Sequence, residues 1–326
     1  VAILASGYIC SAQTEHGLLP YSNKLLLNPS FAGFDRSTST WSNLQFFAGP
    51  ADGLNHSFTI THDTWSDKHK AATAWYFYHG LTGELNTNHT GAGYTFAKPV
   101  TIDDGEFTSS INLNYRVYTK QWFVYIVESW LDKSIDIYEP PGMSLFRYSI
   151  FNPRIGLLWD SPVYNLGISV SYSFRHFELD PVVIGNPEFG QKEYLPEEQP
   201  LHVVLHLSKK MRGKQNGLES QPFRASPELA VLYTDQLLLS RAGLRMEQVS
   251  HLMALFIHNN YTDNTHGLAG VFGWKSDILN VSLTAGGAYS IPTGKPAFFG
   301  EISLGVVVPY QFTNEINPWA PPEDSY

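Results

Sequence analysis

Apolar and polar residues alternate with a period of two over long stretches of this chain. Successive side chains of a β-strand point to opposite faces, so such alternation predicts strands with one apolar and one polar face. In residues 107–117 the apolar set is Phe107, Ile111, Leu113, Tyr115 and Val117, and polar residues fill most positions between them. Residues 165–174, 279–285 and 302–310 repeat the pattern. A helix, whose period is 3.6 residues, cannot produce it.

Weaker runs of similar length raise the predicted number of strands to about fourteen, with sixteen as the alternative. These runs are residues 38–47, 54–63, 71–80, 91–98, 153–160, 201–208, 227–234, 237–246, 250–258 and 266–274. Residues 121–130 either form a further strand or prolong one. Short connections alternate with long ones, notably 131–150 and 175–199. Single-chain barrels of bacterial outer membranes have this rhythm. We therefore predict an all-β fold: a transmembrane, antiparallel, up-and-down β-barrel.

The composition agrees with a membrane barrel. Only 16% of the residues are charged, and the mean hydropathy is −0.17, whereas soluble proteins carry about a quarter charged residues. The polar face consists mainly of Ser, Thr, Asn and Gly, which suits a polar lumen. Aromatic residues near the ends of the runs favour girdles at the membrane interfaces over padding of a soluble core. They are Trp41, Phe46, Phe47, Trp65, Trp122, Trp130, Trp159, Trp274 and Tyr310.

Four segments follow from these patterns. Residues 1–13 are apolar and end in small residues, which predicts the remnant of a signal peptide; the competing hypothesis is lipidation of Cys10. Residues 14–37 form a short N-terminal segment, and residues 38–312 form the barrel. Residues 313–326 are a Pro-rich acidic tail. With a signal peptide and a barrel, we expect the protein in the bacterial outer membrane, in contact with its lipids.

The N-terminal segment carries a motif. Residues 21–34 read Tyr-Ser-Asn-Lys-Leu-Leu-Leu-Asn-Pro-Ser-Phe-Ala-Gly-Phe. This stretch resembles the N-terminal signature of the PorP/SprF family of type IX secretion system membrane proteins, in which Asn-Pro-x-x-Ala-Gly precedes the first strand. Asn28, Pro29, Ala32 and Gly33 match that signature, and the strand rhythm is similar over nearly the whole chain. The acidic tail departs from the family pattern.

The same residues can be interpreted physically. Pro29 biases Asn28 toward an extended conformation, and Gly33 can adopt a positive φ. The three leucines at 25–27 are unfavourable in water. Two interpretations stay open: the segment packs at the barrel mouth or inside it as a partial plug, or it only leads into the first strand.

No residue cluster in the sequence points to catalysis, to a cofactor or to a metal. His202 and His206 would share a strand face about 13 Å apart, too far to bind one metal ion. Asp103-Asp104 is an ordinary turn sequence, and His176 with Asp180 is the other loop cluster that an enzyme could use. The net charge of −9 excludes nucleic acid as an expected partner.

Two functions remain. The resemblance implies a non-enzymatic barrel of the type IX secretion and gliding machinery. Such a barrel would bind periplasmic ring lipoproteins or anchor a secreted adhesin. The alternative is a porin-like channel for small solutes, which would place lumen charges at a constriction; the candidates are Arg116, Arg241 and Glu301.

Overall fold

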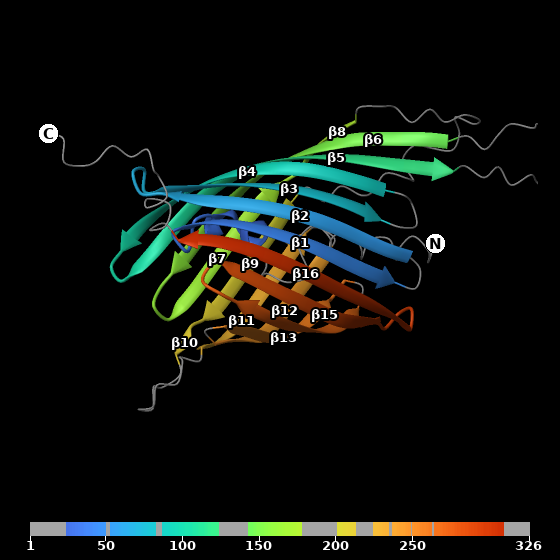
Figure 1. Ribbon diagram of the computed structural model, residues 1–326. Coiled ribbons are helices and arrows are strands. Elements are labelled where there is room, and N and C mark those ends of the chain that lie inside the picture. Colours follow the sequence, from blue (N-terminus) through green and yellow to red (C-terminus); the bar gives the residue numbers. More distant parts are fainter. Residues whose placement is uncertain are drawn as a thin grey trace, which may run out of the picture.

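A closed ring of antiparallel strands makes up the protein (Figure 1). The computed structural model describes residues 24–49, 53–82, 87–123, 143–177, 201–212, 224–234, 237–248, 250–262 and 264–309. The strands are β1 (Ser37–Gly49), β2 (Gly53–Ser66), β3 (Ala71–Thr82), β4 (Thr87–Ile102), β5 (Gly105–Phe123), β6 (Met143–Asp160), β7 (Tyr164–Tyr172), β8 (Phe174–Phe177), β9 (Leu201–Lys209), β10 (Met211–Arg212), β11 (Arg224–Thr234), β12 (Leu237–Gln248), β13 (His251–Asn260), β14 (Thr265–Lys275), β15 (Leu279–Ser290) and β16 (Lys295–Pro309).

Two pairs of these segments are single strands with one irregular residue. β7 and β8 pair with β6 in the same register, and β9 and β10 pair with β11 in the same register. The sixteen segments therefore make fourteen strands. Pairing of β16 with β1 closes the ring. The predicted antiparallel barrel of about fourteen strands is confirmed.

The two faces of the wall differ as the alternation predicts. Large apolar side chains cover the outer face; Ile111, Ile155 and Phe298 are 58%, 60% and 64% exposed. Inward residues of the same strands, such as Asn112 and Ser110, are buried. An apolar outer belt on a closed ring is the surface that a lipid bilayer requires. None of the helical segments in the described ranges has the length and apolarity needed to cross a bilayer.

The structure lengthens several predicted strands. β6 begins at Met143, so the second part of the predicted loop 131–150 is strand. Residues 121–123 prolong β5, and residues 175–177 belong to β8. The alternation is weak in these parts, which is why the sequence placed them in loops. The predicted signal-peptide remnant, the acidic tail and residues 178–199 lie outside the described residues.

The prediction that these aromatic residues form girdles at the membrane interfaces is wrong for three of them. Trp159 and Trp274 lie on the outer face, as does Phe46. Trp65 and Phe47 are buried on the inner face, and Trp41 also points inward and lines a cavity. The inner aromatics pack against other lumen side chains instead of lipid. Of Trp130, Tyr310 and the Trp122 side chain the structure gives no description.

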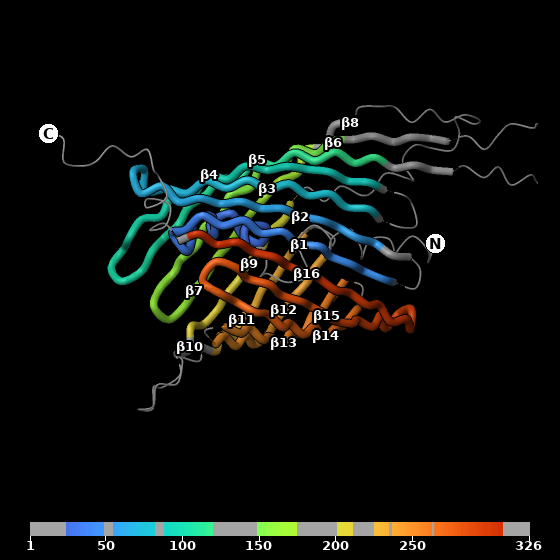
Figure 2. Tube along the Cα trace, in the orientation of Figure 1, coloured from blue at the N-terminus to red at the C-terminus, as the bar shows by residue number. Residues whose placement is uncertain are grey.

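The barrel has two distinguishable ends. At the turn end, where β1 begins, the connections 67–70, 103–104, 161–163 and 276–278 are short. The two longest connections, 124–142 and 178–200, join strands at the opposite loop end. The Cα trace in Figure 2 shows neighbouring strands running side by side between these two ends. Inside the ring, near the turn end, lies the short blue coil of α2 (Lys24–Leu27) and η1 (Pro29–Phe31) in Figure 1.

Candidate functional site: an N-terminal segment docked across the lumen

Residues Lys24–Arg36, here named the plug, fold locally before they meet the barrel wall. Asn28 separates α2 from η1 in an extended conformation (φ −148°) and caps η1, because its Oδ1 accepts a hydrogen bond from the Ser30 backbone N–H at 3.0 Å. Pro29 occupies the first position of η1, where no backbone donor is needed. The Asn-Pro pair of the motif is thus a helix start signal.

The Asn28 side chain also fixes the plug to the barrel wall. Its Nδ2 donates to the backbone carbonyls of Leu157 in β6 (3.0 Å) and Ile168 in β7 (3.2 Å). Two inward glycines make room for it. A Cβ on Gly156 would lie 2.3 Å from Asn28 Oδ1, and a Cβ on Gly167 would lie 2.8 Å from Asn28 Nδ2. The seat for Asn28 therefore depends on glycine at both wall positions.

Further hydrogen bonds hold the plug on the same wall. Arg154 Nη1 donates to the Leu26 carbonyl at 2.7 Å, and Ser169 Oγ donates to the Leu27 carbonyl at 3.1 Å. These bonds satisfy carbonyls at the C-terminal end of α2, which have no partner within such a short helix. The hydroxyls of Ser30 and Ser110 lie 2.8 Å apart, which ties η1 to β5.

The leucines of α2 reach walls on opposite sides of the ring. Leu25 packs in a cluster formed by β2, β3 and β4, which includes Trp65 and Tyr76. Leu27 packs against Val204, Leu232, Leu237 and Leu239 of β9, β11 and β12. In the ring order these two groups of strands face one another. The plug therefore crosses the lumen, and burial of its leucines stabilises that position.

The Ala-Gly pair ends the plug where it turns into β1. Ala32 caps η1 and is buried, at 4% exposed. Gly33 has φ +62°, a left-handed conformation that favours glycine, and a Cβ there would lie 2.4 Å from the Ala72 Cβ. Its N–H donates to Asp63 Oδ2 at 2.9 Å, and the other carboxylate oxygen of Asp63 accepts from Ser39.

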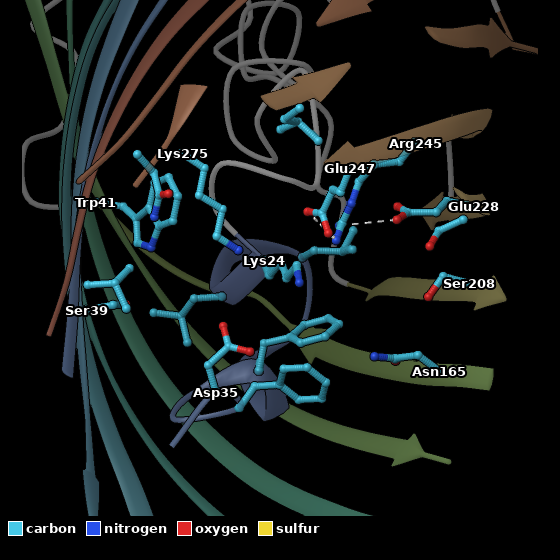
Figure 3. Close-up of a pocket in the computed structure, with 18 of the residues that line it drawn as sticks. Lys24, Asp35, Ser39, Trp41, Asn165, Ser208, Glu228, Arg245, Glu247 and Lys275 are labelled. Atoms are coloured by element: carbon cyan, nitrogen blue, oxygen red, sulfur yellow. Dashed lines mark hydrogen bonds and ion pairs between the residues drawn. The ribbon is translucent and has the colours of Figure 1, made fainter. Parts of the chain in front are cut away.

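A cavity of about 1080 Å³ lies beside the plug at the turn end (Figure 3). We name it the mouth cavity. Plug residues such as Leu25, Leu27 and Phe31 form one side of it, and residues of β1, β2, β9 and β11–β15 form most of the rest, with Asp160 of β6 and Asn165 of β7. The plug is fixed to β5, β6 and β7, so most of the free space is on the other side of the lumen. The plug is therefore one wall of the mouth cavity.

Charged side chains dominate the β11–β12 side of the mouth cavity. Arg245 forms ion pairs with Glu247 at 2.8 Å and with Glu228 at 3.4 Å. Lys24 of the plug lies near this group, with its ammonium 5.6 and 5.5 Å from the ring centroids of Phe31 and Phe34. Burial lowers the pKa of the Lys24 ammonium, and the nearby Arg245 guanidinium lowers it further.

The structure gathers the four motif residues, Asn28, Pro29, Ala32 and Gly33, into the docked plug. The lumen charges are not gathered. Arg116, Arg241 and Glu301 lie on β5, β12 and β16, and each contacts neighbours on its own wall. Glu301, for example, accepts from Gln45 and Ser303. In the described ranges, no three His, Cys, Asp or Glu side chains are grouped to hold a metal ion.

The histidine and aspartate candidates have ordinary surroundings where they are described. His206 Nε2 lies 3.1 Å from Asn165 Oδ1, and its ring contacts Phe31 of the plug. Asp103 and Asp104 form the β4–β5 turn, with Asp103 at φ 50°. The His176 side chain and Asp180 lie outside the described part.

Sequence reasoning missed the wall residues that receive the plug: Ser110, Arg154, Gly156, Gly167 and Ser169. They lie on three strands far from residue 28 in the chain, and each fits the ordinary alternation of an inward face. The available signal was weak: two glycines inside otherwise regular strands, which mark a close approach of other groups.

Comparison with known proteins supports the fold and no narrower assignment. The sequence matches no protein-family model and no curated protein. Among solved structures, the chain is similar to the CymD monoaromatic hydrocarbon channel, with a TM-score of 0.55 and 9% identity over 88% of this chain and 92% of that one. It is also similar to the toluene transporter TbuX of Ralstonia pickettii, with a TM-score of 0.50 and 9% identity over 88% of this chain and 93% of that one. The chain has the fold of outer-membrane β-barrels.

Proposed function

We propose that this protein is a non-enzymatic barrel of the bacterial outer membrane that serves as a binding scaffold of the type IX secretion and gliding machinery. It binds the ring lipoproteins of that system or anchors a secreted adhesin. The observation that carries the proposal is the docked plug. The residues that resemble the PorP/SprF signature are those that fix the plug across the lumen, and a lumen crossed by a fixed segment suits a scaffold better than a wide pore.

The geometry of the two ends supports this role. Bacterial barrels place short turns in the periplasm and long loops outside. On that rule the turn end, with the plug and the mouth cavity, faces the periplasm and the ring lipoproteins. The loop end faces the cell exterior, where an adhesin would be held. Rigid strands position both surfaces, and such surfaces commonly carry binding sites.

The test compares two glycines with positive φ, Gly33 in the plug and Gly294 (φ +66°) in the β15–β16 turn of the loop end. Gly33→Val is expected to displace the plug, because its Cβ overlaps Ala72. The protein is tagged, cross-linked in cells and purified, and the ring lipoproteins are quantified by mass spectrometry. Their recovery should fall with Gly33→Val and stay normal with Gly294→Val. Unchanged recovery with a displaced plug would refute a role of this end in scaffold binding.

A channel for small solutes is the second candidate. It is favoured by the fold shared with a monoaromatic hydrocarbon channel and a toluene transporter. Planar-bilayer recordings distinguish the two. The scaffold predicts low conductance for the natural protein and a large rise when Gly33→Val displaces the plug. Steady conductance that is equal in both proteins would favour the channel.

A further inference from the structure

Two connections at the turn end share a sequence pattern and a set of hydrogen bonds. Residues 159–166 read Trp-Asp-Ser-Pro-Val-Tyr-Asn-Leu between β6 and β7, and residues 274–281 read Trp-Lys-Ser-Asp-Ile-Leu-Asn-Val between β14 and β15. In each, the serine N–H donates to the carbonyl three residues on, at 2.8 Å for Ser161 and 2.7 Å for Ser276. Each serine hydroxyl accepts from the N–H of that same residue at 2.9 Å. The two connections are therefore matched turns.

The outer faces beside the matched turns differ. Tyr164 of β7 pairs with Lys209 of β9, whereas Leu279 of β15 pairs with Val306 of β16. All four side chains point outward and are exposed. An apolar pair is therefore sufficient beside such a turn on a lipid-facing wall. The tyrosine and the lysine, here named the rim pair, need another explanation.

Lys209 brings a positive charge to this rim without a bound carboxylate. Its ammonium lies 5.9 Å from the centroid of the Tyr164 ring. Among the described side chains, Lys209 takes part in no ion pair, while the adjacent Lys210 pairs with Asp160. The ring contact positions the Lys209 ammonium and leaves its charge in place.

Carboxylates of nearby strands are engaged elsewhere. Glu228 of β11 lines the lumen and pairs with Arg245, and Glu106 of β5 pairs with Arg36. Along the chain, residues 209–214 read Lys-Lys-Met-Arg-Gly-Lys, with four cations and no carboxylate. The outer rim at the start of this stretch therefore keeps its positive charge.

The level of the rim pair on the wall fits that of lipid headgroups. Leu166 and Leu207 form the next outward pair toward the middle of the wall and are 51% and 41% exposed. Trp159 of β6 pairs with Leu166 on the same face. On the other side of the rim pair, β7 ends in the turn 161–163. Aromatic rings favour the headgroup level, and a lysine there attracts anionic lipids.

We propose that the rim pair binds the phosphate of an anionic phospholipid in the leaflet at the turn end. The Lys209 ammonium pairs with the headgroup phosphate, the Tyr164 ring holds the ammonium at that level, and the acyl chains lie against Leu166 and Leu207. This inference is independent of the proposed scaffold function, because it requires only that the barrel lies in a bilayer. It assigns a lipid of stated charge to one place on the wall.

Native mass spectrometry of the purified full chain in mixed micelles tests the proposal. The probes, at equal concentration, are anionic phosphatidylglycerol and phosphatidylcholine, whose headgroup has no net charge. The protein should retain phosphatidylglycerol about fivefold more than phosphatidylcholine, and Lys209→Gln should remove most of that preference. Lys98→Gln is the control, because Lys98 is also an exposed, outward lysine, on β4. It should lower the preference by less than about twofold.

The second matched turn allows a gain-of-function test. Leu279→Tyr with Val306→Lys copies the rim pair there and should add a second retained phosphatidylglycerol. Failure of this double variant to retain more of it would count against the rim pair as the binding element. Equal retention of both lipids by the natural protein, or an equal loss of preference in Lys98→Gln and Lys209→Gln, would overturn the proposal. Displacement of phosphatidylglycerol by inorganic phosphate at the same concentration would also overturn it, because the ligand would then be a free anion.

Discussion

The lumen wall formed by β5, β6 and β7 differs from the wall formed by β13–β16. The first presents serine, asparagine, arginine and glycine inward, and it holds the plug by hydrogen bonds to backbone carbonyls and to Ser30. The second presents a cluster of small and aromatic apolar residues. These are Ala254, Phe256, Ala269, Val271, Ala288 and Phe299, joined by Phe47 of β1.

Both walls obey the same alternation, so the difference concerns what each inner face contacts. Polar side chains are concentrated on the β5–β7 wall, where Arg154 and Ser169 donate to plug carbonyls that have no partner within α2. A buried carbonyl without a donor is unfavourable. Apolar side chains gather where side chains pack against one another. Polarity of the inner face thus varies around the ring.

The largest expected effect on docking of the plug comes from filling the space on the wall that Asn28 occupies. Gly156→Val would place a Cβ 2.3 Å from Asn28 Oδ1 and 2.6 Å from Ser110 Oγ. Docking of the plug should weaken by about 3 kcal/mol. Hydrogen exchange of the amides 28–34 should accelerate accordingly. Ala288→Val, on the apolar wall, is the control and should leave the exchange of these amides unchanged; equal acceleration would contradict a specific seat.

Truncating a leucine tests the apolar contacts of the plug. Leu25→Ala removes a side chain that is 8% exposed, and docking should weaken by about 2.5 kcal/mol. Leu26→Ala should cost less, because Leu26 is only partly buried. Hydrogen exchange of the plug amides measures both variants. If neither variant accelerated exchange, packing on the β2–β4 wall would not position the plug.

Loss of the Asn28 side chain should have the next largest effect on docking of the plug. Asn28→Ala removes the cap of η1 and both bonds to the wall carbonyls, with a cost of about 2 kcal/mol. Asn28→Ser keeps a cap acceptor and loses the donor to the wall. Its exchange rates should therefore lie between those of the natural protein and Asn28→Ala. A serine variant as mobile as the alanine variant would assign the whole effect to the wall contacts.

Arg154→Met should have a smaller effect. It leaves the Leu26 carbonyl without its donor at 2.7 Å, which should weaken docking by about 1.5 kcal/mol. Plug amides should exchange faster, while the unfolding midpoint of the barrel in urea changes little. A large shift of that midpoint would show that Arg154 supports the wall more than the plug.

The smallest effect is expected on the lipid face. Nothing lies within 4 Å of a Cβ added to Gly270, which is outward on β14. Gly270→Ala should therefore stabilise the barrel by about 0.5 kcal/mol, through the unfolded chain alone. Urea titration in detergent measures it. Destabilisation would mean that Gly270 has a packing role, which we expect only of the inward glycines.

Alternation was sufficient to predict the strands because every membrane strand must separate a lipid face from a lumen face. It did not predict which face the aromatics of β1 take. Outward Thr38, Thr40 and Ser42 are as polar as inward Ser39 and Asn43, so the phase of Trp41 cannot be read from its neighbours. The docking of Asn28 depends on Gly156 and Gly167, which only the folded barrel brings to it.

The span from Leu25 to Leu27 makes the plug an intramolecular ligand of the closed ring. The strands that it joins, β2–β4 and β9–β12, face one another across the closed ring. A ligand that binds only the native form stabilises it in proportion to its own affinity. Each kcal/mol of docking therefore adds to the stability of the closed ring.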